Sequence, residues 1–444
     1  MKNNISIRIK EKLNANSLIL LLRNHFAKIP DHRSDNCKIS LVDGIMSAYA
    51  MFSLKEQSVL AFETRAEKSN DNLKSIYGLK DIPTDTHMRT MLDEISPDYI
   101  KQGFKLIYNR LQRSKELEKF LFMDEYYLVS MDGTGYFSSQ TINCDNCLEK
   151  TGKDGKVTYY HQFLGAAIIH PCMREVIPLA PEMIIKQDGS NKNDCERNAA
   201  KRFLGDFRKE HPKLNVVVVE DGLSPNAPHI KELKINHCHF ILGVKPDDHK
   251  FLFQRVAELK ELGEVSEVAI IEGDITHVFS FCNNQPLNES NQDVQINFLE
   301  YWEINNKTGK TQHFTWVTDF QITQKNVYQL MRGGRARWKI ENETFNTLKN
   351  QGYNFEHNYG HGHKNLSSIF ALLMMLAFLV DQTLQLSCNL FRAAWKTCVT
   401  RINLWDTIRN YFWTMIVVSM NQIYEAIYYG IKKQQIEVLY ENSA

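Results

Sequence analysis

Residues 214–220, LNVVVVE, place the strongest constraint on the fold of this chain. Four consecutive valines predict a β-strand with both faces buried, and such strands lie in sheets that helices cover on both sides. The polar, alanine-containing segment 193–208 predicts a helix just before this strand. Three earlier runs are rich in β-branched and aromatic residues and predict strands as well: YYLVSMD at 126–132, YYHQFLGAAIIH at 159–170 and REVIPLA at 174–180. The sequence therefore predicts an α/β fold, a mixed sheet with flanking helices.

Helices are predicted on either side of this strand-rich region. Residues 1–120 have apolar positions at helical spacing and no alternation typical of strands. Strand-like runs such as THVFSFC and INFLEYWE, separated by polar turns, predict a β-rich insertion, and helical patterns resume near residue 327. We therefore expect four parts: a helical N-terminal domain at 1–120, a core at 121–224 and 312–385, a β-rich insertion at 225–311, and C-terminal helices at 386–444.

The charge balance excludes a strongly basic protein. The chain has 444 residues and a formal net charge of +1, so binding to nucleic acid would depend on local basic patches. Two such patches are present: residues 1–40 carry Lys2, Arg8, Lys10, Lys12, Arg23, Lys28, Arg33 and Lys38, and residues 325–339 carry Lys325, Arg332, Arg335, Arg337 and Lys339.

Several features indicate a cytoplasmic protein that is not inserted in a membrane. The first residues contain no apolar stretch of the signal-peptide type. The nine cysteines lack regular spacing, which indicates reduced thiols. The apolar run 369–380 is shorter than the roughly 20 residues that span a bilayer, so we expect a buried core helix.

Two aspartates are predicted to stand where strands end. Asp132 follows LVSM and precedes Gly133, and Asp221 follows VVVVE and precedes Gly222. Ligands bind at the carboxyl ends of strands in α/β sheets. For one isolated Asp-Gly pair a simple turn is the better interpretation, but two such pairs favour a site. Glu220 is less suitable, because successive strand residues point to opposite faces.

A third carboxylate lies in a predicted helix. Four residues recur at intervals of three, four and three, the spacing of one helical stripe: Trp338, Glu341, Phe345 and Leu348. We expect this stripe to be buried, with Trp338 packed in the core, and a buried carboxylate needs a cation or a metal ion as its partner. Glu343 lies on another side of the helix and is expected to be solvated or to make a surface contact. Together with Asp132 and Asp221, Glu341 indicates a metal-dependent phosphoryl-transfer site.

The two strand-end aspartates and the RWKIE stretch around Glu341 resemble the three acidic residues of DDE transposases of bacterial insertion sequences. Within that family the chain is similar to the group with a β-rich insertion between the second Asp and the Glu. The resemblance covers roughly residues 120–385, and its most specific part is RGGRARWKIENETFNTLKNQGYNFEHNYGHG at 332–362. Arg337 matches the signature Tyr-x-x-Arg-x-x-x-Glu-x-x-x-x-x-x-Lys of the group. Gly334 stands at the Tyr position, and Leu348 stands at the Lys position with Lys349 next to it.

The resemblance implies an RNase H-like catalytic core, with which the predicted order of three strands, a helix and a strand agrees. It implies an enzyme that cleaves transposon ends and joins them to target DNA. Asp132 would bridge two Mg²⁺ ions, or Mn²⁺ in their place, and Asp221 and Glu341 would each complete one ion's ligands. The expected partners are double-stranded DNA and a second copy of the chain, with the N-terminal domain helping to bind the transposon ends.

Basic residues near Glu341 are the candidates for contacts with DNA. Arg337 and Lys349 would contact phosphates and neutralise developing charge. Arg335 and Lys339 belong to the same basic patch and are further candidates for DNA binding. Two rival functions remain open: a related nuclease or resolvase that cuts DNA without strand transfer, and a domesticated DNA-binding protein that keeps the fold. The presence of all three acidic residues argues against the second.

Other polar clusters give weaker signals. Cys144-x-x-Cys147 is half of a zinc site, and His161 or the cluster at 237–239 could complete it. Because no second CxxC accompanies it, reduced thiols are the preferred interpretation, and no structural zinc is expected. The segment 186–196 is predicted to be a supporting or DNA-facing loop. A polar, glycine-rich loop is preferred over a metal or phosphate site for three histidines after the Glu341 helix: His357, His361 and His363.

Overall fold

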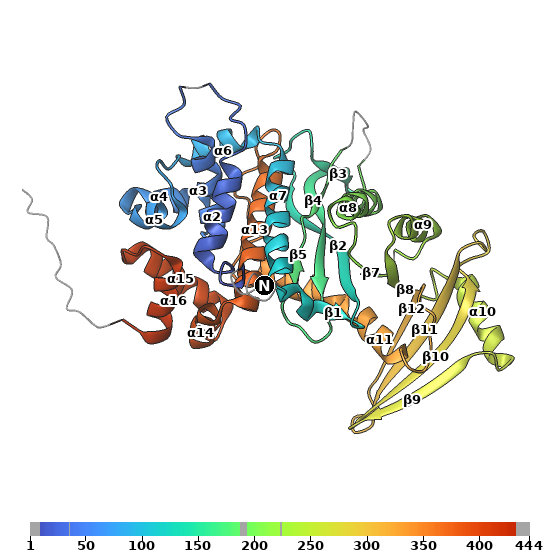
Figure 1. The fold of residues 1–444 in the computed structure, drawn as a ribbon. Helices are drawn as coiled ribbons and strands as arrows, with labels where there is room; N and C mark the ends of the chain where they lie inside the picture. The colour runs from blue at the N-terminus through green and yellow to red at the C-terminus, as the bar shows by residue number, and fades with distance from the viewer. Residues whose placement is uncertain (1–8, 35, 187–192, 223, 432–444) are drawn as a thin grey trace, which may run out of the picture.

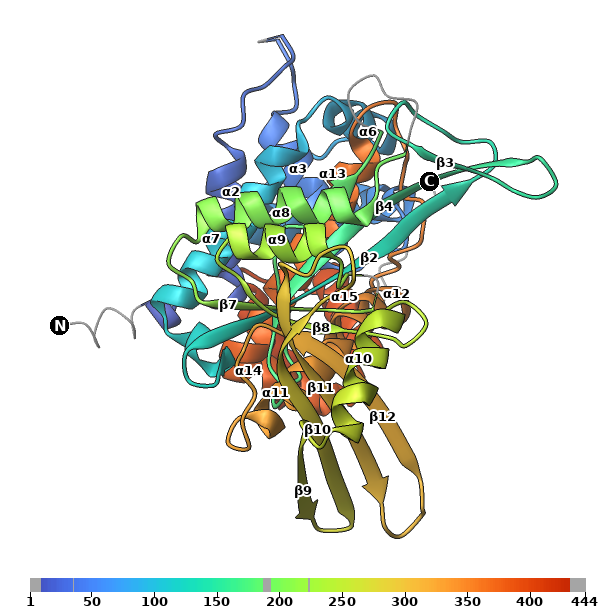
Figure 2. The same cartoon turned by 90° about the vertical axis from the view of Figure 1, so that its right-hand side faces the viewer.

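The computed structural model describes residues 9–431 except 35, 187–192 and 223. Within these residues, twelve β-strands form one mixed sheet, and helices cover it (Figures 1 and 2). Its longest path runs β3-β4-β2-β7-β8-β12-β11-β10-β9. The predicted α/β fold is therefore confirmed. Of the predicted features, Lys2, Arg8, most of the loop at 186–196 and the end of the C-terminal helices lie outside the described residues.

The centre of the sheet contains the strands that the sequence predicted. β2 (Tyr126–Ser139) pairs antiparallel with β4 (Val157–Ile169) and parallel with β7 (Val216–Glu220). β7 is buried along its whole length, as four consecutive valines require. β8 (His239–Gly243) follows in parallel with β7. The remaining short strands lie at the side of β2 or β4: β1 (Leu121–Phe122), β3 (Leu148–Thr151), β5 (Ile177–Pro178) and β6 (Glu182–Ile184).

Helices cover both faces of this central part. α8 (Glu196–Glu210) packs against β2, β4 and β6, and α9 (Ala227–Ile235) packs against β8. Because α8 and α9 connect β6 to β7 and β7 to β8, the chain follows the predicted order of strands, a helix and a strand. On the other face lie α11 (Val327–Ala336) and a π-helix, η2 (Ile340–Phe345), which α12 (Asn346–Asn350) continues.

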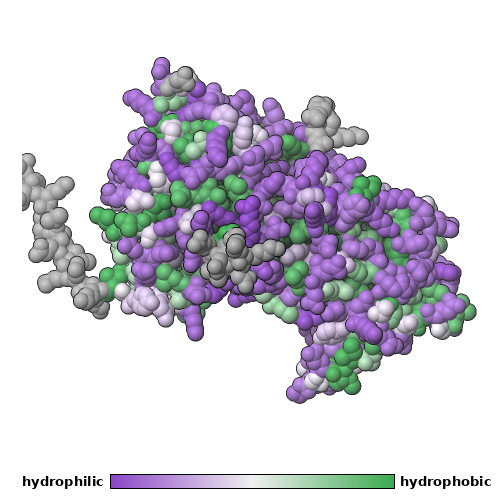
Figure 3. Space-filling model, viewed as in Figure 1, coloured by the Kyte–Doolittle hydropathy of each residue, from purple (hydrophilic) through white to green (hydrophobic). Residues whose placement is uncertain are grey.

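α13 (Leu366–Ser387) is the central helix of the helical half of the molecule (Figure 1). It packs against helices α3, α6 and α7 and against β5. Among the described residues it is the one helix long and apolar enough to cross a membrane, yet 94% of its apolar 18-residue window is buried inside the protein. The predicted core helix is therefore confirmed, and the surface in Figure 3 is mostly hydrophilic with scattered apolar patches.

The other helices surround α13 or follow it. The N-terminal helices are α2 (Ala15–Phe26), α3 (Leu41–Ser53), α4 (Val59–Lys68), α5 (Asp71–Tyr77), α6 (Asp85–Asp93), α7 (Pro97–Arg113) and the short 3-10 helix η1 (Glu116–Phe120). The C-terminal helices are α14 (Asn389–Cys398), α15 (Arg401–Thr414) and α16 (Met420–Tyr429). α2 contacts α16, so the two ends of the described chain lie in the same helical half.

The β-rich insertion extends the central sheet. Its strands are β9 (Ser266–Glu272), β10 (Ile275–Pro286) and β11 (Gln295–Asn305), which form an antiparallel meander with β12 (Thr311–Thr318). β12 pairs antiparallel with β8, so the insertion joins the core through backbone hydrogen bonds. α10 (Lys250–Glu261) packs against β10. The strands of the insertion project away from the helical half (Figure 1).

Candidate functional site

The pairing of β2 with β7 brings Asp132 and Asp221 side by side. The parallel register ends with Ser130 opposite Val219. Asp132 and Asp221 each stand two residues beyond this pair, so continuation of the register places them opposite one another on the same face. Both aspartates line one cavity, and the negative charge of Asp221 acts on the Asp132 carboxyl.

Glu341 belongs to the same face of the sheet. The Ser130 hydroxyl donates a hydrogen bond of 3.2 Å to the main-chain carbonyl of Arg337, which shows that the Ser130 face is the one below η2. Asp132, two residues along β2, shares that face. The guanidinium of Arg337 in turn pairs with the Glu341 carboxylate at 2.7 Å.

Electrostatics show that these groups form one cluster. Burial raises the pKa of Asp132 to about 6, and the negative charges of Glu341 and Asp221 contribute to the rise. The backbone N–H of Gly133 and the positive charge of Arg337 oppose it. Carboxylates that repel each other in this way are stabilised by a cation among them, and oxygen ligands of this kind suit hard divalent cations. The charges of Asp221 and Glu341 thus both act on the Asp132 carboxyl.

Glu220 and Glu343, the rival carboxylates, have other partners. The Glu220 carboxylate bonds to His229 Nε2 of α9 at 2.5 Å, and both residues line the same cavity as Asp132 and Asp221. Burial opposes protonation of His229, but the Glu220 charge outweighs it and raises the pKa of the imidazole. Glu343 lies 3.6 Å from Arg174. The choice of Asp221 and Glu341 over these two carboxylates stays a prediction.

The expectation of a buried stripe through Trp338 and Glu341 is wrong. Trp338 is 54% exposed, and the Glu341 side chain is 42% exposed. The regular helix is interrupted at Arg337, and from Ile340 the chain continues as a π-helix in which the N–H of Asn346 bonds to the carbonyl of Glu341. Because of both changes, the side chains do not follow the directions expected for a regular helix with 3.6 residues per turn. Single π-turns occur frequently at functional sites.

Close packing explains why Gly334 stands where the signature that the sequence partly resembles has Tyr. A Cβ atom there would lie 2.5 Å from Nε1 of Trp316 in β12. The helix α11 and strand β12 therefore approach each other too closely for any side chain at this position. The departure from the signature has a local steric cause, and a tyrosine would not fit here.

The predicted DNA-binding residues point in different directions. Arg337 alone contacts the carboxylate cluster. Arg335 pairs with Glu303 of the insertion and lies over the ring of Phe314, and Lys339 donates to the carbonyl of Met173 at 2.6 Å. Lys349 pairs with Glu356 at 2.9 Å. In the N-terminal patch, three basic residues have acidic partners: Lys10 with Glu116, Arg23 with Asp43 and Arg33 with Asp31.

A cavity beside the two aspartates adds residues that sequence reasoning did not assign to the site. It is lined by Asp132 and Asp221 together with Asp194 and Glu196 from the start of α8. Glu196 lies against Gly133, where a Cβ atom would collide with its carboxylate. Burial and the charge of Asp221 raise the pKa of Glu196. The segment was predicted to be a supporting or DNA-facing loop, and its acidic residues were not assigned to the site.

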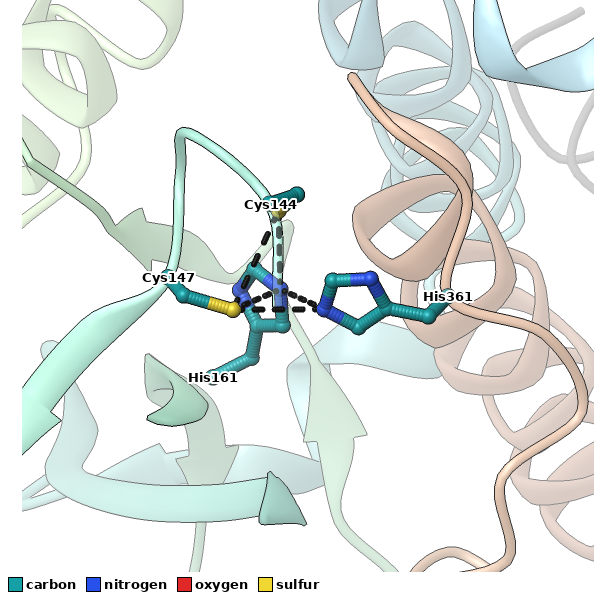
Figure 4. A group of neighbouring side chains, drawn as sticks. All are labelled: Cys144, Cys147, His161 and His361. Carbon is teal, nitrogen blue, oxygen red and sulfur yellow. Dashed lines mark hydrogen bonds between the residues drawn. The ribbon is translucent and has the colours of Figure 1, made fainter. Parts of the chain in front are cut away.

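A second cluster corrects the expectation that the chain holds no structural zinc. Cys144, Cys147, His161 and His361 come together, with one potential ligand atom of each within 4.8 Å of all the others (Figure 4). The thiols and His161 were recognised as half of a zinc site. His361, 200 residues beyond His161, was assigned to a polar loop because no local pattern connects the two. The alternative completion at 237–239 is not used, since His239 pairs with Asp319.

Comparison with known proteins adds no relative. No family model matches the chain, and no curated protein matches it.

Proposed function

We propose that the protein is a DDE-type DNA transposase, which cleaves transposon ends and joins them to target DNA. The observation that carries this proposal is the convergence of Asp132, Asp221 and Glu341 from two adjacent strands and the η2 helix. The family resemblance of the same residues supports it. On this proposal the enzyme acts on double-stranded DNA as a homodimer in the bacterial cytoplasm.

Each residue of the cluster then has a role. Asp132, Asp221 and Glu341 would together hold the divalent cations that the family resemblance implies. Bound there, the cations would activate a water or a 3′-hydroxyl and stabilise the leaving oxygen. Arg337, which pairs with Glu341 in the protein alone, would reach a DNA phosphate once a cation takes over that carboxylate.

The test uses DNA that carries the flanks of the protein's own gene. We expect cleavage at defined positions and joined products when a divalent cation such as Mg²⁺ is added, and none after chelation. Asp132→Asn, Asp221→Asn and Glu341→Gln should each lower cleavage by at least about 100-fold, because two-metal chemistry depends on every ligand. Cleavage without joined products would instead support a nuclease or resolvase.

Glu343→Gln is the matched control for Glu341→Gln. It makes the same chemical change two residues away, on a carboxylate that faces Arg174. We expect Glu343→Gln to retain cleavage. If Glu341→Gln cleaved as well as Glu343→Gln, the site assignment would be wrong.

A further inference from the structure

The four side chains of the second cluster have the mutual distances of a tetrahedral metal centre. With Zn–S of about 2.3 Å and Zn–N of about 2.0 Å, ligand sulfurs lie about 3.8 Å apart, sulfur and nitrogen about 3.5 Å, and nitrogens about 3.3 Å. The Cys144 and Cys147 sulfurs are 3.9 Å apart, and the two imidazole Nε2 atoms are 3.1 Å apart. The sulfur of Cys144 lies 3.5 Å from Nε2 of His161. The sulfur of Cys147 lies 3.4 Å from Nε2 of His161 and 3.2 Å from Nε2 of His361.

We propose that Cys144, Cys147, His161 and His361 bind one structural zinc ion that joins the catalytic strands to the segment following the Glu341 helix. Two thiolates and two imidazoles are a ligand set that selects zinc over magnesium or calcium. Four protein ligands leave no open position, which distinguishes a structural from a catalytic site. The site is independent of the proposed transposase activity.

The fold prepares these ligands. The CxxC turn lies between β2 and β3, and the Cys147 N–H bonds to the Cys144 carbonyl at 3.1 Å. Leu148 pairs with Tyr160 across β3 and β4, so Cys147 and His161 lie next to each other at the end of that ladder. His361 approaches from the opposite side, out of the segment that precedes α13 (Figure 4).

Hydrogen bonding leaves His361 ready to bind a metal. Its Nδ1 lies 3.0 Å from the carbonyl of Gly362, which it can reach only as a donor. The proton is then on Nδ1, and the lone pair of Nε2 faces the cluster. Cys147, His161 and His361 are buried, and Cys144 is partly buried. Without an ion, two imidazole nitrogens and two sulfurs would converge in a buried space with few donors among them.

The position of the site shows what the ion would hold together. His161 lies four residues from Gly165 on β4, and Gly165 pairs with Asp132, so the site is about 13 Å along the strand from that carboxylate. His361 lies 20 residues after Glu341 in the chain. One ion would therefore connect the hairpin that carries Asp132 with the segment that leads away from Glu341.

The direct test is the metal content of the full-length protein, purified without chelators. We expect one zinc per chain by elemental mass spectrometry. Cys147→Ser and His361→Gln should lose most of it, whereas Cys37→Ser, a partly buried thiol outside the cluster, should retain it. A wild-type protein without zinc after expression in zinc-supplemented medium would overturn the proposal, and so would undiminished zinc in both ligand variants.

Cobalt substitution gives a readout that does not depend on how the variants fold. Wild-type protein loaded with Co²⁺ should show the intense visible absorption of a tetrahedral site together with a thiolate charge-transfer band. An octahedral spectrum, or no thiolate band, would contradict the assignment. Removal of zinc with a chelator should lower the melting temperature of the wild type but not that of a folded His361→Gln variant.

Discussion

Gly334 stands at a position where close packing opposes any side chain. It lies in α11, where alanine is ordinarily more favourable than glycine by up to about 1 kcal/mol. At position 334 the gain in helix stability from alanine is opposed by a clash with the indole of Trp316, a rigid ring that cannot move aside easily. The balance of these two effects can be measured.

We expect Gly334→Ala to lower the free energy of unfolding by about 1–3 kcal/mol, the usual cost of overpacking. Gly205→Ala is the matched control, because Gly205 also lies in a helix, α8, and a Cβ atom there meets nothing within 4 Å. That variant should be slightly more stable than wild type. Urea denaturation of the three proteins checks both signs, and equal stability of the two variants would contradict the steric explanation.

At the scale of secondary-structure elements, the beginning of α13 has an unusual cap. The side chain of Asn365 makes no capping hydrogen bond. Instead, Asp93 of α6 accepts hydrogen bonds from four successive backbone N–H groups at 2.8–3.0 Å: His363, Lys364, Asn365 and Leu366. A residue 270 positions away in the sequence therefore caps the core helix and fixes the segment that follows His361.

Asp93→Asn should destabilise the protein by roughly 2 kcal/mol near neutral pH, because hydrogen bonds to a charged acceptor are stronger than those to an amide. Burial alone would raise the pKa of Asp93, but the four N–H donors outweigh it and lower the pKa. The carboxylate thus stabilises the fold above its unfolded pKa of about 4, and this contribution disappears as the pH falls through the lowered folded value.

Thermal unfolding of wild type and Asp93→Asn over a range of acidic pH checks this. The stability difference should shrink as the pH decreases, and a constant difference would contradict the charge-based explanation. Asp98→Asn serves as the control, because the Asp98 side chain is 82% exposed. That variant should remain close to wild type throughout.

How far the sequence could predict these elements depended on the range of the interactions. The buried strand β7 and its end before Asp221 were predicted correctly, because strand patterns are local properties. The strand end predicted at Asp132 was wrong, because β2 continues past this residue to Ser139 in its pairing with β4. The exposure of Trp338 was not predicted, because the interruption at Arg337 and the π-helix change the directions of the side chains around the helix without altering composition. The cluster of Cys144, Cys147, His161 and His361 was missed because His361 reaches it through tertiary packing alone.

At the scale of the whole molecule, a buried ion pair links four distant segments. Lys55, just after α3, lies 2.5 Å from Asp381 of α13. The hydroxyl of Tyr353 donates to the same carboxylate at 2.7 Å, and the Lys55 ammonium lies 4.0 Å from the ring centre of Trp405 in α15. The N-terminal helices, the core helix and the C-terminal helices thus meet at one charged contact.

Removing one partner would leave the other charge buried without compensation. We expect Lys55→Met and Asp381→Asn each to lower the free energy of unfolding by about 3–5 kcal/mol. The double variant Lys55→Met/Asp381→Asn should cost less than the sum of the single effects. A double-mutant cycle measured by chemical denaturation tests this, with the exposed pair Lys209 and Asp206 as a control that should couple by less than about 1 kcal/mol.

The pairing of β12 with β8 has a mechanical consequence. Ile241 of β8 pairs on one side with Val219 of β7, which stands two residues before Asp221. On the other side it pairs with Thr318 of β12. An unbroken hydrogen-bonded ladder therefore runs from the far edge of the insertion to the carboxylates, with no linker between them. The insertion therefore does not swing about a flexible linker, and a force applied at β9 is transmitted to the central strands as a change in the twist of the sheet. If the proposed function holds, a DNA duplex bound by the insertion would meet the carboxylates at an angle that the geometry of the sheet determines.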